Sequence, residues 1–134
     1  MQANKEVINR FIEEVINQRN FAAMEEFVAE DFIEHVPLPG QGPGRAGLQY
    51  AVKLLTTAFP DLHWVADEQI AEGDTVVTRF TWTGTHAGEF LGIPATGKKV
   101  AVWGVVIDVV RDGWFCESRI IMDLPSLLQQ LGVQ

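Results

Sequence analysis

The chain has 134 residues, of which 47% are hydrophobic and 21% charged, and its net charge is -8 at pH 7. This balance is typical of an ordinary globular protein, and the length predicts a single domain spanning residues 1–134. The acidic charge argues against nucleic acids and anionic membranes as partners, because both select basic surfaces. No uncharged run is long enough to cross a bilayer, the N-terminus lacks a signal-peptide pattern, and the single cysteine cannot form an internal disulfide. These observations favour a cytoplasmic protein.

The first half of the chain is predicted to be mainly helical. Apolar residues recur at helical spacing over 1–18 and 21–28, which predicts an amphipathic helix followed by a shorter one. Residues 31–36 are typical of a short strand, and residues 46–59 resume the helical spacing. Between them, the segment 37–47 (P-L-P-G-Q-G-P-G-R-A-G) is predicted to be a loop, because proline and glycine punctuate it throughout. An ordered loop of this kind is typical of a pocket wall or lid, and disorder is the alternative.

The second half of the chain is predicted to form strands. Runs rich in valine, threonine and aromatic residues are separated by turns, and they predict strands at 62–72, 75–84, 98–111 and 114–123. A short closing helix is predicted from Pro125. Helices followed by long antiparallel strands indicate an α+β fold. The stretch 100–110 is apolar on both faces, so one face is expected to meet the helices and the other a pocket or a partner subunit.

Asp123 is a candidate acid/base residue because it ends the last predicted strand. One alternate set of that strand consists of Phe115, Glu117, Arg119, Ile121 and Asp123. If this set faces inward, the Asp123 carboxylate ends an apolar surface, and burial would raise its pKa into the range useful for proton transfer. An inward Arg119 would instead pair with Asp123 and lower that pKa, and a β-bulge would exchange the two faces. Asp123 also directly precedes the closing helix, so an N-cap is the alternative role.

Two other side chains are predicted to take part in catalysis. His35 precedes the proline- and glycine-rich loop, and its imidazole titrates near neutrality. Arg79 lies in the middle of a predicted strand, where it would stabilise an oxyanion, pair with a carboxylate or extend to solvent. The three histidines lack the spacing of metal ligands, so the sequence predicts no metal site.

The predicted substrate-binding side chains are aromatic or cationic: Trp103, Arg119, Phe80, Phe59 and Tyr50. Trp103 is the leading candidate for a ligand-facing ring, because it stands among small and β-branched residues. Core packing is the alternative for the aromatic residues, and solvent exposure is the alternative for Tyr50.

Several stretches together resemble one family. They are N-R-F-I-E-E-V-I-N-Q-R-N at 9–20, D-F-I-E-H-V-P-L-P-G-Q-G-P-G-R-A-G at 31–47, A-F-P-D-L at 58–62, A-E-G-D-T-V-V-T-R at 71–79, T-G-T-H-A-G-E-F-L-G-I-P-A-T-G at 83–97, and D-L-P-S-L-L-Q-Q-L-G at 123–132. On these residues nearly the whole chain resembles the SnoaL-like polyketide cyclases, within the nuclear-transport-factor-2-like superfamily.

This resemblance implies a cone-shaped α+β fold, in which N-terminal helices pack on a curved, mostly antiparallel sheet around an apolar pocket. It also implies no metal or organic cofactor, and homodimers or larger homo-oligomers. In the cyclases an aspartate ending the last strand, which Asp123 matches, is the acid/base of an intramolecular aldol ring closure, and His35 matches a pocket-lining position. The chain is therefore expected to be an enzyme acting on a hydrophobic, polyketide-like carbonyl compound.

The chain departs from the family pattern in its last strand, where it has E-S-R at 117–119 in place of E-H-W. In the preceding strand, the stretch from Trp103 to Val110 offers only Asp108 as a polar group, so a second catalytic group is not evident. Sister families hydrolyse epoxides or form pyran rings, which here would require Arg119 or Arg79 to bridge Asp123 and Asp108. The non-enzymatic alternative is a protein that binds an apolar small molecule, with Asp123 serving only as a cap.

Overall fold

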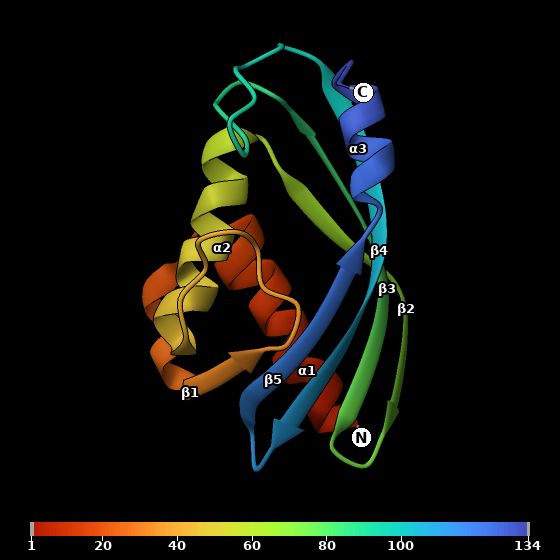
Figure 1. The fold of residues 1–134 in the computed structure, drawn as a ribbon. Coiled ribbons are helices and arrows are strands. Elements are labelled where there is room, and N and C mark those ends of the chain that lie inside the picture. The colour runs from red at the N-terminus through yellow and green to blue at the C-terminus, as the bar shows by residue number, and fades with distance from the viewer. Residues whose placement is uncertain (1, 134) are drawn as a thin grey trace.

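A computed structural model describes residues 2–133, so the first residue of the predicted N-terminal helix and both ends of the predicted 1–134 domain lie outside the described part. The helical segments are α1 (Gln2–Arg10), the π-helix η1 (Phe11–Asn17), the 3-10 helix η2 (Phe21–Glu26), α2 (Gly44–Ala58) and α3 (Leu124–Gln130). The strands are β1 (Val28–Glu34), β2 (His63–Glu72), β3 (Thr75–Thr85), β4 (Lys99–Arg111) and β5 (Trp114–Met122). The α+β class is confirmed (Figure 1). Within the described residues, every helix is too short or too polar to cross a membrane.

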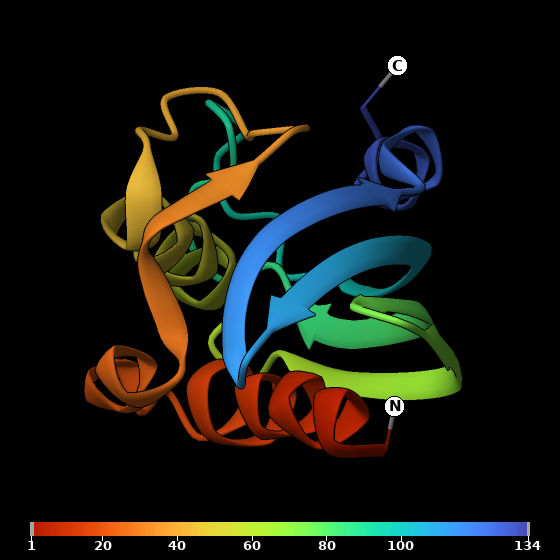
Figure 2. The ribbon, with the colours of Figure 1, turned by 90° about the horizontal axis from the view of Figure 1, so that it is seen from below.

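The strands form one sheet in the order β1-β5-β4-β3-β2. Only β1 and β5 are parallel, and the other neighbouring pairs are antiparallel, which confirms the mostly antiparallel sheet. The sheet is curved and open, with β1 and β2 at its edges (Figure 2). After β5 ends, α3 runs beside the first part of β4, where the Gln130 side chain hydrogen-bonds to both backbone groups of Ala101 at 2.9 and 2.8 Å.

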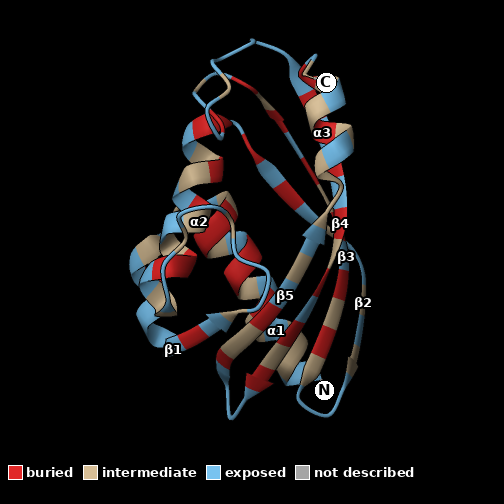
Figure 3. Cartoon of the chain, viewed as in Figure 1, coloured by how far each residue is buried: buried red, intermediate tan, exposed pale blue. Residues whose placement is uncertain are grey.

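The core lies between the inner face of the sheet and the helices α1, η1 and α2. β3 and β4 alternate between buried and more exposed residues along their whole length, as expected for strands with one face on a core (Figure 3). α2 buries Leu48, Val52 and Leu55, which recur at helical spacing. The helix ends just before Pro60, whose ring disfavours helical geometry in the residue before it. Burial of these two apolar faces against each other is the main stabilising contribution.

A β-bulge in β5 decides which of its residues face the core. Val109 pairs with Glu117, whereas Val110 pairs with Phe115, so Cys116 has no partner residue on β4. Because of this extra residue, Phe115 and Ser118 are both buried although they are three positions apart. The inward set predicted for this strand is therefore wrong beyond Phe115. Glu117 and the outer-facing residues after it lie on the opposite face from the core.

Candidate active site

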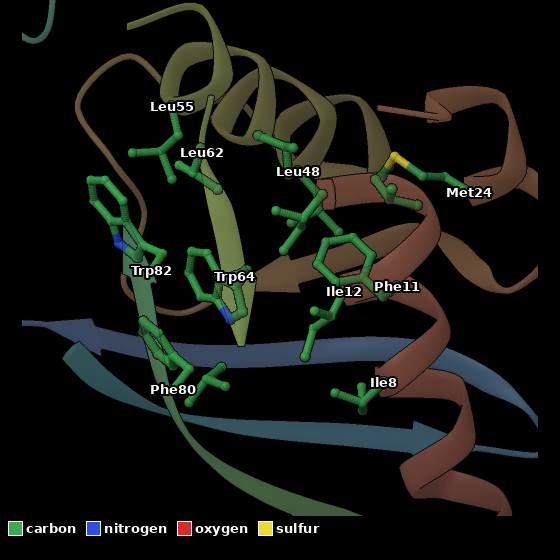
Figure 4. Close-up of a cluster of buried hydrophobic side chains, with 14 of the residues drawn as sticks. Ile8, Phe11, Ile12, Met24, Leu48, Leu55, Leu62, Trp64, Phe80 and Trp82 are labelled. Atoms are coloured by element: carbon green, nitrogen blue, oxygen red, sulfur yellow. The ribbon is translucent and has the colours of Figure 1, made fainter. Parts of the chain in front are cut away.

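A cavity of about 90 Å³ opens between the inner face of the sheet, the N-terminal helices, α2 and the loop that follows β1. Its apolar walls come from Ile8, Phe11, Ile12, Ile16, Val36, Leu38, Leu48, Ala51, Val52, Leu55, Leu62, Trp64, Val106, Phe115, Ile120 and Met122. Side chains of η1, α2 and β2 point toward one another across this space (Figure 4). The volume is enough for several water molecules or for part of a small ligand.

The proline- and glycine-rich loop forms one wall of the cavity, as the sequence predicts. Leu38 and Gln41 contribute lining side chains, as does Val36 just before the loop. The loop holds its own shape through a hydrogen bond of 3.0 Å from the Leu38 N–H to the Gln41 Oε1. The wall is therefore built from a segment without regular secondary structure, of the kind that commonly carries binding residues.

Asp108 is the most deeply buried charged group in the cavity wall. It is on the inner face of β4 and is only 2% exposed. Burial raises the pKa of the Asp108 carboxyl to about 8, a hydrogen bond from Ser118 opposes the shift, and the nearby charge of Glu34 adds to it. Its Oδ1 has no hydrogen-bond partner among residues 2–133. Because a buried polar atom without a partner is costly, this oxygen is available to a ligand atom.

Glu34 and Ser118 lie in the same row of the sheet as Asp108. Ser118 of β5 pairs with Glu34 of β1 on one side and with Asp108 of β4 on the other. All three line the cavity. The Glu34 Oε2 accepts hydrogen bonds from the backbone N–H groups of Val36 at 3.0 Å and Ile120 at 3.3 Å. Burial raises the pKa of Glu34, while these two bonds and Ser118 lower it.

The cavity thus combines two carboxyls with perturbed pKa values and an apolar lining that, among the described residues, includes no lysine, arginine or histidine. No group of three or more histidine, cysteine, aspartate or glutamate side chains in residues 2–133 is arranged to hold a metal ion. The chemistry that these residues can supply is proton transfer to and from an apolar ligand.

Comparison with known proteins identifies the family. A model of the SnoaL-like polyketide cyclases matches residues 6–131. The chain belongs to the SnoaL-like polyketide cyclase family. A search of the curated proteins finds no match.

Among solved structures, this SnoaL-like chain is similar to TsrD from Streptomyces laurentii, with 27% identity, coverage of 99% of this chain and 97% of TsrD, and a TM-score of 0.89. IdmH from Streptomyces antibioticus, described as a candidate polyketide cyclase, has 30% identity, coverage of 97% and 99%, and a TM-score of 0.83. AclR from Streptomyces galilaeus, described as a candidate hydroxylase, has 26% identity, coverage of 98% and 97%, and a TM-score of 0.84. Since the described activities of these neighbours differ, the residues of the cavity must decide the chemistry.

The structure places Asp123 at α3 and not in the cavity wall. Its side chain accepts a hydrogen bond of 3.1 Å from the Ser126 N–H, which is the N-cap arrangement that the sequence left open. Asp123 is absent from the described lining of the cavity. The bulge at Cys116 is the physical reason, because it turns the residues that follow it to the opposite faces from those predicted.

Three other predicted site residues lie on the outer face of the sheet, away from the cavity. Arg79 pairs with Glu68 at 2.7 Å and Asp67 at 3.6 Å, on the exposed side of β3. Trp103 is 51% exposed, and Arg119 is exposed on β5. An arginine bridge to Asp108 is therefore excluded in this structure, because Asp108 faces inward. The geometry required for the epoxide-opening or pyran-forming alternative is contradicted.

The remaining predicted site residues also lie outside the cavity lining. His35 is on the exposed side of the chain after β1, where its Nε2 lies 2.9 Å from the Glu117 Oε1. Phe59 and Phe80 are fully buried core residues, packed against Trp82 and Trp64 respectively. Tyr50 is 41% exposed on α2. The aromatic residues among them take the alternatives of core packing or exposure.

The sequence contained signals for the residues that do line the site. Asp108 is the single polar group in the apolar stretch 100–110 of its strand, which is an indication of a functional carboxyl. Glu34 is two positions after the buried Phe32, so strand alternation places it on the inner side. Ser118 could be found only by allowing for the bulge.

Proposed function

We propose that this family member is a cofactor-independent cyclase that closes a ring by intramolecular aldol addition on an apolar, polyketide-like carbonyl compound. The observation that carries the proposal is the Asp108 carboxyl, which is buried in the wall of an apolar cavity with an oxygen that lacks a partner in the described chain. A carbonyl or hydroxyl oxygen of a ligand would complete its hydrogen bonding.

Asp108 acts as the acid of the reaction. Since burial raises its pKa to about 8, the carboxyl is mostly protonated at neutral pH and can donate its proton. Transfer of a proton from the carbon next to one carbonyl to a basic group of the cavity gives an enolate, and the enolate carbon forms a bond with the carbon of a second carbonyl. The π electrons of that second carbonyl move to its oxygen, which takes the proton of Asp108. The product is an isomer of the substrate, so no cofactor is consumed.

The lining indicates the substrate class. Its polar members in the described residues are Glu34, Gln41, Thr56, Asp108 and Ser118, and the rest are apolar. Such a surface favours a neutral, largely aromatic or aliphatic compound over an anion, because no positive side chain of the described lining would balance a negative charge. The enclosed volume is small for a multi-ring compound, so we expect substrate binding to displace the loop wall.

The test compares two aspartate variants on a panel of aromatic β-keto esters that carry a second carbonyl within ring-closing reach. Asp108→Asn should lower turnover by about 10²–10⁴-fold, the usual contribution of a general acid or base. Asp123→Asn is the matched control, because asparagine is an equally good N-cap and the same charge is removed. Full turnover in Asp108→Asn would overturn the proposal. Binding of the esters by the wild type without conversion would instead support the small-molecule binding protein.

We also propose that the outer face of the sheet forms a homodimer interface. Trp103, Ile107 and Ile121 lie on this face and are 51%, 39% and 67% exposed, respectively. A patch with exposed tryptophan and isoleucine is typical of interfaces. Light scattering should give twice the one-chain mass for the wild type and the one-chain mass for Ile121→Arg. Leu91→Arg, in the loop between β3 and β4, should remain a dimer. A wild type at the one-chain mass would contradict this assembly.

A further inference from the structure

Two backbone hydrogen bonds fix the position of the second carboxyl of the cavity, Glu34. It ends β1, and its Oε2 is fixed by the two backbone N–H groups of Val36 and Ile120. Both of these bonds go to Oε2, so the other carboxyl oxygen, Oε1, takes neither of them. Backbone donors stabilise the ionised form of a carboxylate. Glu34 is also less buried than Asp108, so of the two groups it holds a negative charge at the lower cost.

The two carboxyls are coupled through the sheet. Ser118 pairs with both of them in neighbouring strands, and it lowers the pKa of each. No positive side chain of residues 2–133 lines the cavity to balance two negative charges there. Two carboxylates that share an apolar site do not both ionise easily, so the pair retains one proton. Asp108, which is buried and has one oxygen without a partner among residues 2–133, is the group that keeps it.

We propose that Glu34 is the general base that works with the acid Asp108, and that the Ser118 hydroxyl passes the proton between them. This inference rests on the proposed ring closure and assigns the group that starts it. Both carboxyls line one cavity, so both can reach a single bound ligand. The division of roles follows from their surroundings: two backbone N–H groups bind Glu34, whereas Asp108 is almost fully buried in the wall of the cavity.

In the proposed cycle, protons move only among the substrate, Glu34, Asp108 and Ser118. The Glu34 carboxylate takes the proton from the carbon next to the first carbonyl, and Asp108 gives its proton to the oxygen of the second. After ring closure Glu34 is protonated and Asp108 is ionised. The Ser118 hydroxyl then donates its proton to Asp108 and accepts one from Glu34, which restores the starting state. Nothing is oxidised or reduced, and no co-reactant is required.

The first test measures the coupling without any ligand. Carboxyl carbon NMR titrations of the full chain should show that Glu34→Gln lowers the midpoint of Asp108, because the neighbouring negative charge is removed. Ser118→Ala should raise the midpoints of both carboxyls, because the residue that lowers the pKa of each is removed. Glu117→Gln is the matched control: it removes one charge from the residue next to Ser118 but on the outer face, and it should leave Asp108 unchanged. An Asp108 midpoint that Glu34→Gln does not move would overturn the inference.

The second test separates this inference from the proposed function. In D₂O the wild type should catalyse deuterium uptake at the acidic carbon of ethyl benzoylacetate, a reaction that needs a base but no ring closure. Glu34→Gln should lower the catalysed rate by about 10²-fold or more, and Glu117→Gln should not. A wild-type rate in Glu34→Gln would overturn the role of Glu34, yet leave ring closure by Asp108 standing. Full ring closure in Asp108→Asn would overturn the proposed function, whatever Glu34 does.

Discussion

Replacing Asp108 by asparagine should remove a pH dependence of stability that this one buried group creates. The folded-state pKa is raised from 3.8 to about 8, so the folded protein keeps this proton where the unfolded chain has already released it. The stability that the proton contributes is therefore fully present below the unfolded pKa and is lost as the pH rises toward 8. Asparagine has nearly the shape of the protonated carboxyl and does not titrate. The Asp108→Asn variant should therefore not lose this stability as the pH rises.

The magnitude follows from the width of the pH window. Each pH unit between the two pKa values costs the folded state about 1.4 kcal/mol for one group. From about pH 5.5 to about pH 7.5, the wild type should therefore lose about 3 kcal/mol more than Asp108→Asn. The pKa of Glu34 is raised in the same direction, but that contribution is present in both proteins and cancels in the difference.

Urea unfolding followed by tryptophan fluorescence measures this difference directly, because the free energy of unfolding is obtained at each pH. Asp123→Asn serves as the control for the removal of one negative charge, and its stability should change with pH in parallel with the wild type. Parallel curves for the wild type and Asp108→Asn would refute the reasoning, because the carboxyl would then titrate in the folded state as it does in water. Such a result would also remove the physical basis for Asp108 as a neutral acid.

Three further predictions concern other parts of the fold. Asp123→Ala should lower the free energy of unfolding by about 1 kcal/mol, because alanine cannot accept the N-cap hydrogen bond of α3, whereas Asp123→Asn should retain the stability. Equal free energies of unfolding for the two variants in urea would contradict the cap. Gly104→Ala should destabilise the protein by roughly 2–4 kcal/mol, because a Cβ there would overlap the backbone carbonyl oxygen of Ile121. An unchanged melting temperature would contradict that close approach. His35→Ala should raise the pKa of Glu117 toward its ordinary value, because the hydrogen bond to His35 is the main cause that lowers this pKa. An NMR titration in which the Glu117 midpoint does not move would exclude this contact.

Local pattern was sufficient for most elements of the fold. The helix predicted at 46–59 is α2 at Gly44–Ala58, and the strands predicted at 62–72 and 98–111 are β2 and β4 within one residue at each end. These features depend on periodicity along a single segment, so they can be inferred without knowing what the segment packs against. The family, and with it the α+β sheet, could be recognised for the same reason, because its motifs are contiguous stretches of chain.

The site depended on contacts between segments, which no single stretch contains. One unpaired residue, Cys116, turned Ser118 into the cavity and left Asp123 to cap a helix, and its position is set by the pairing of β5 with β4. Glu34 and Asp108 come from strands that are far apart in sequence. They line the same cavity because β5 pairs with both of those strands. The pKa of Asp108 likewise depends on what surrounds it in space, since burial by distant residues is what raises it. The chain itself therefore determined which segments are helices and strands, whereas strand register and burial decided which carboxyl faces the cavity.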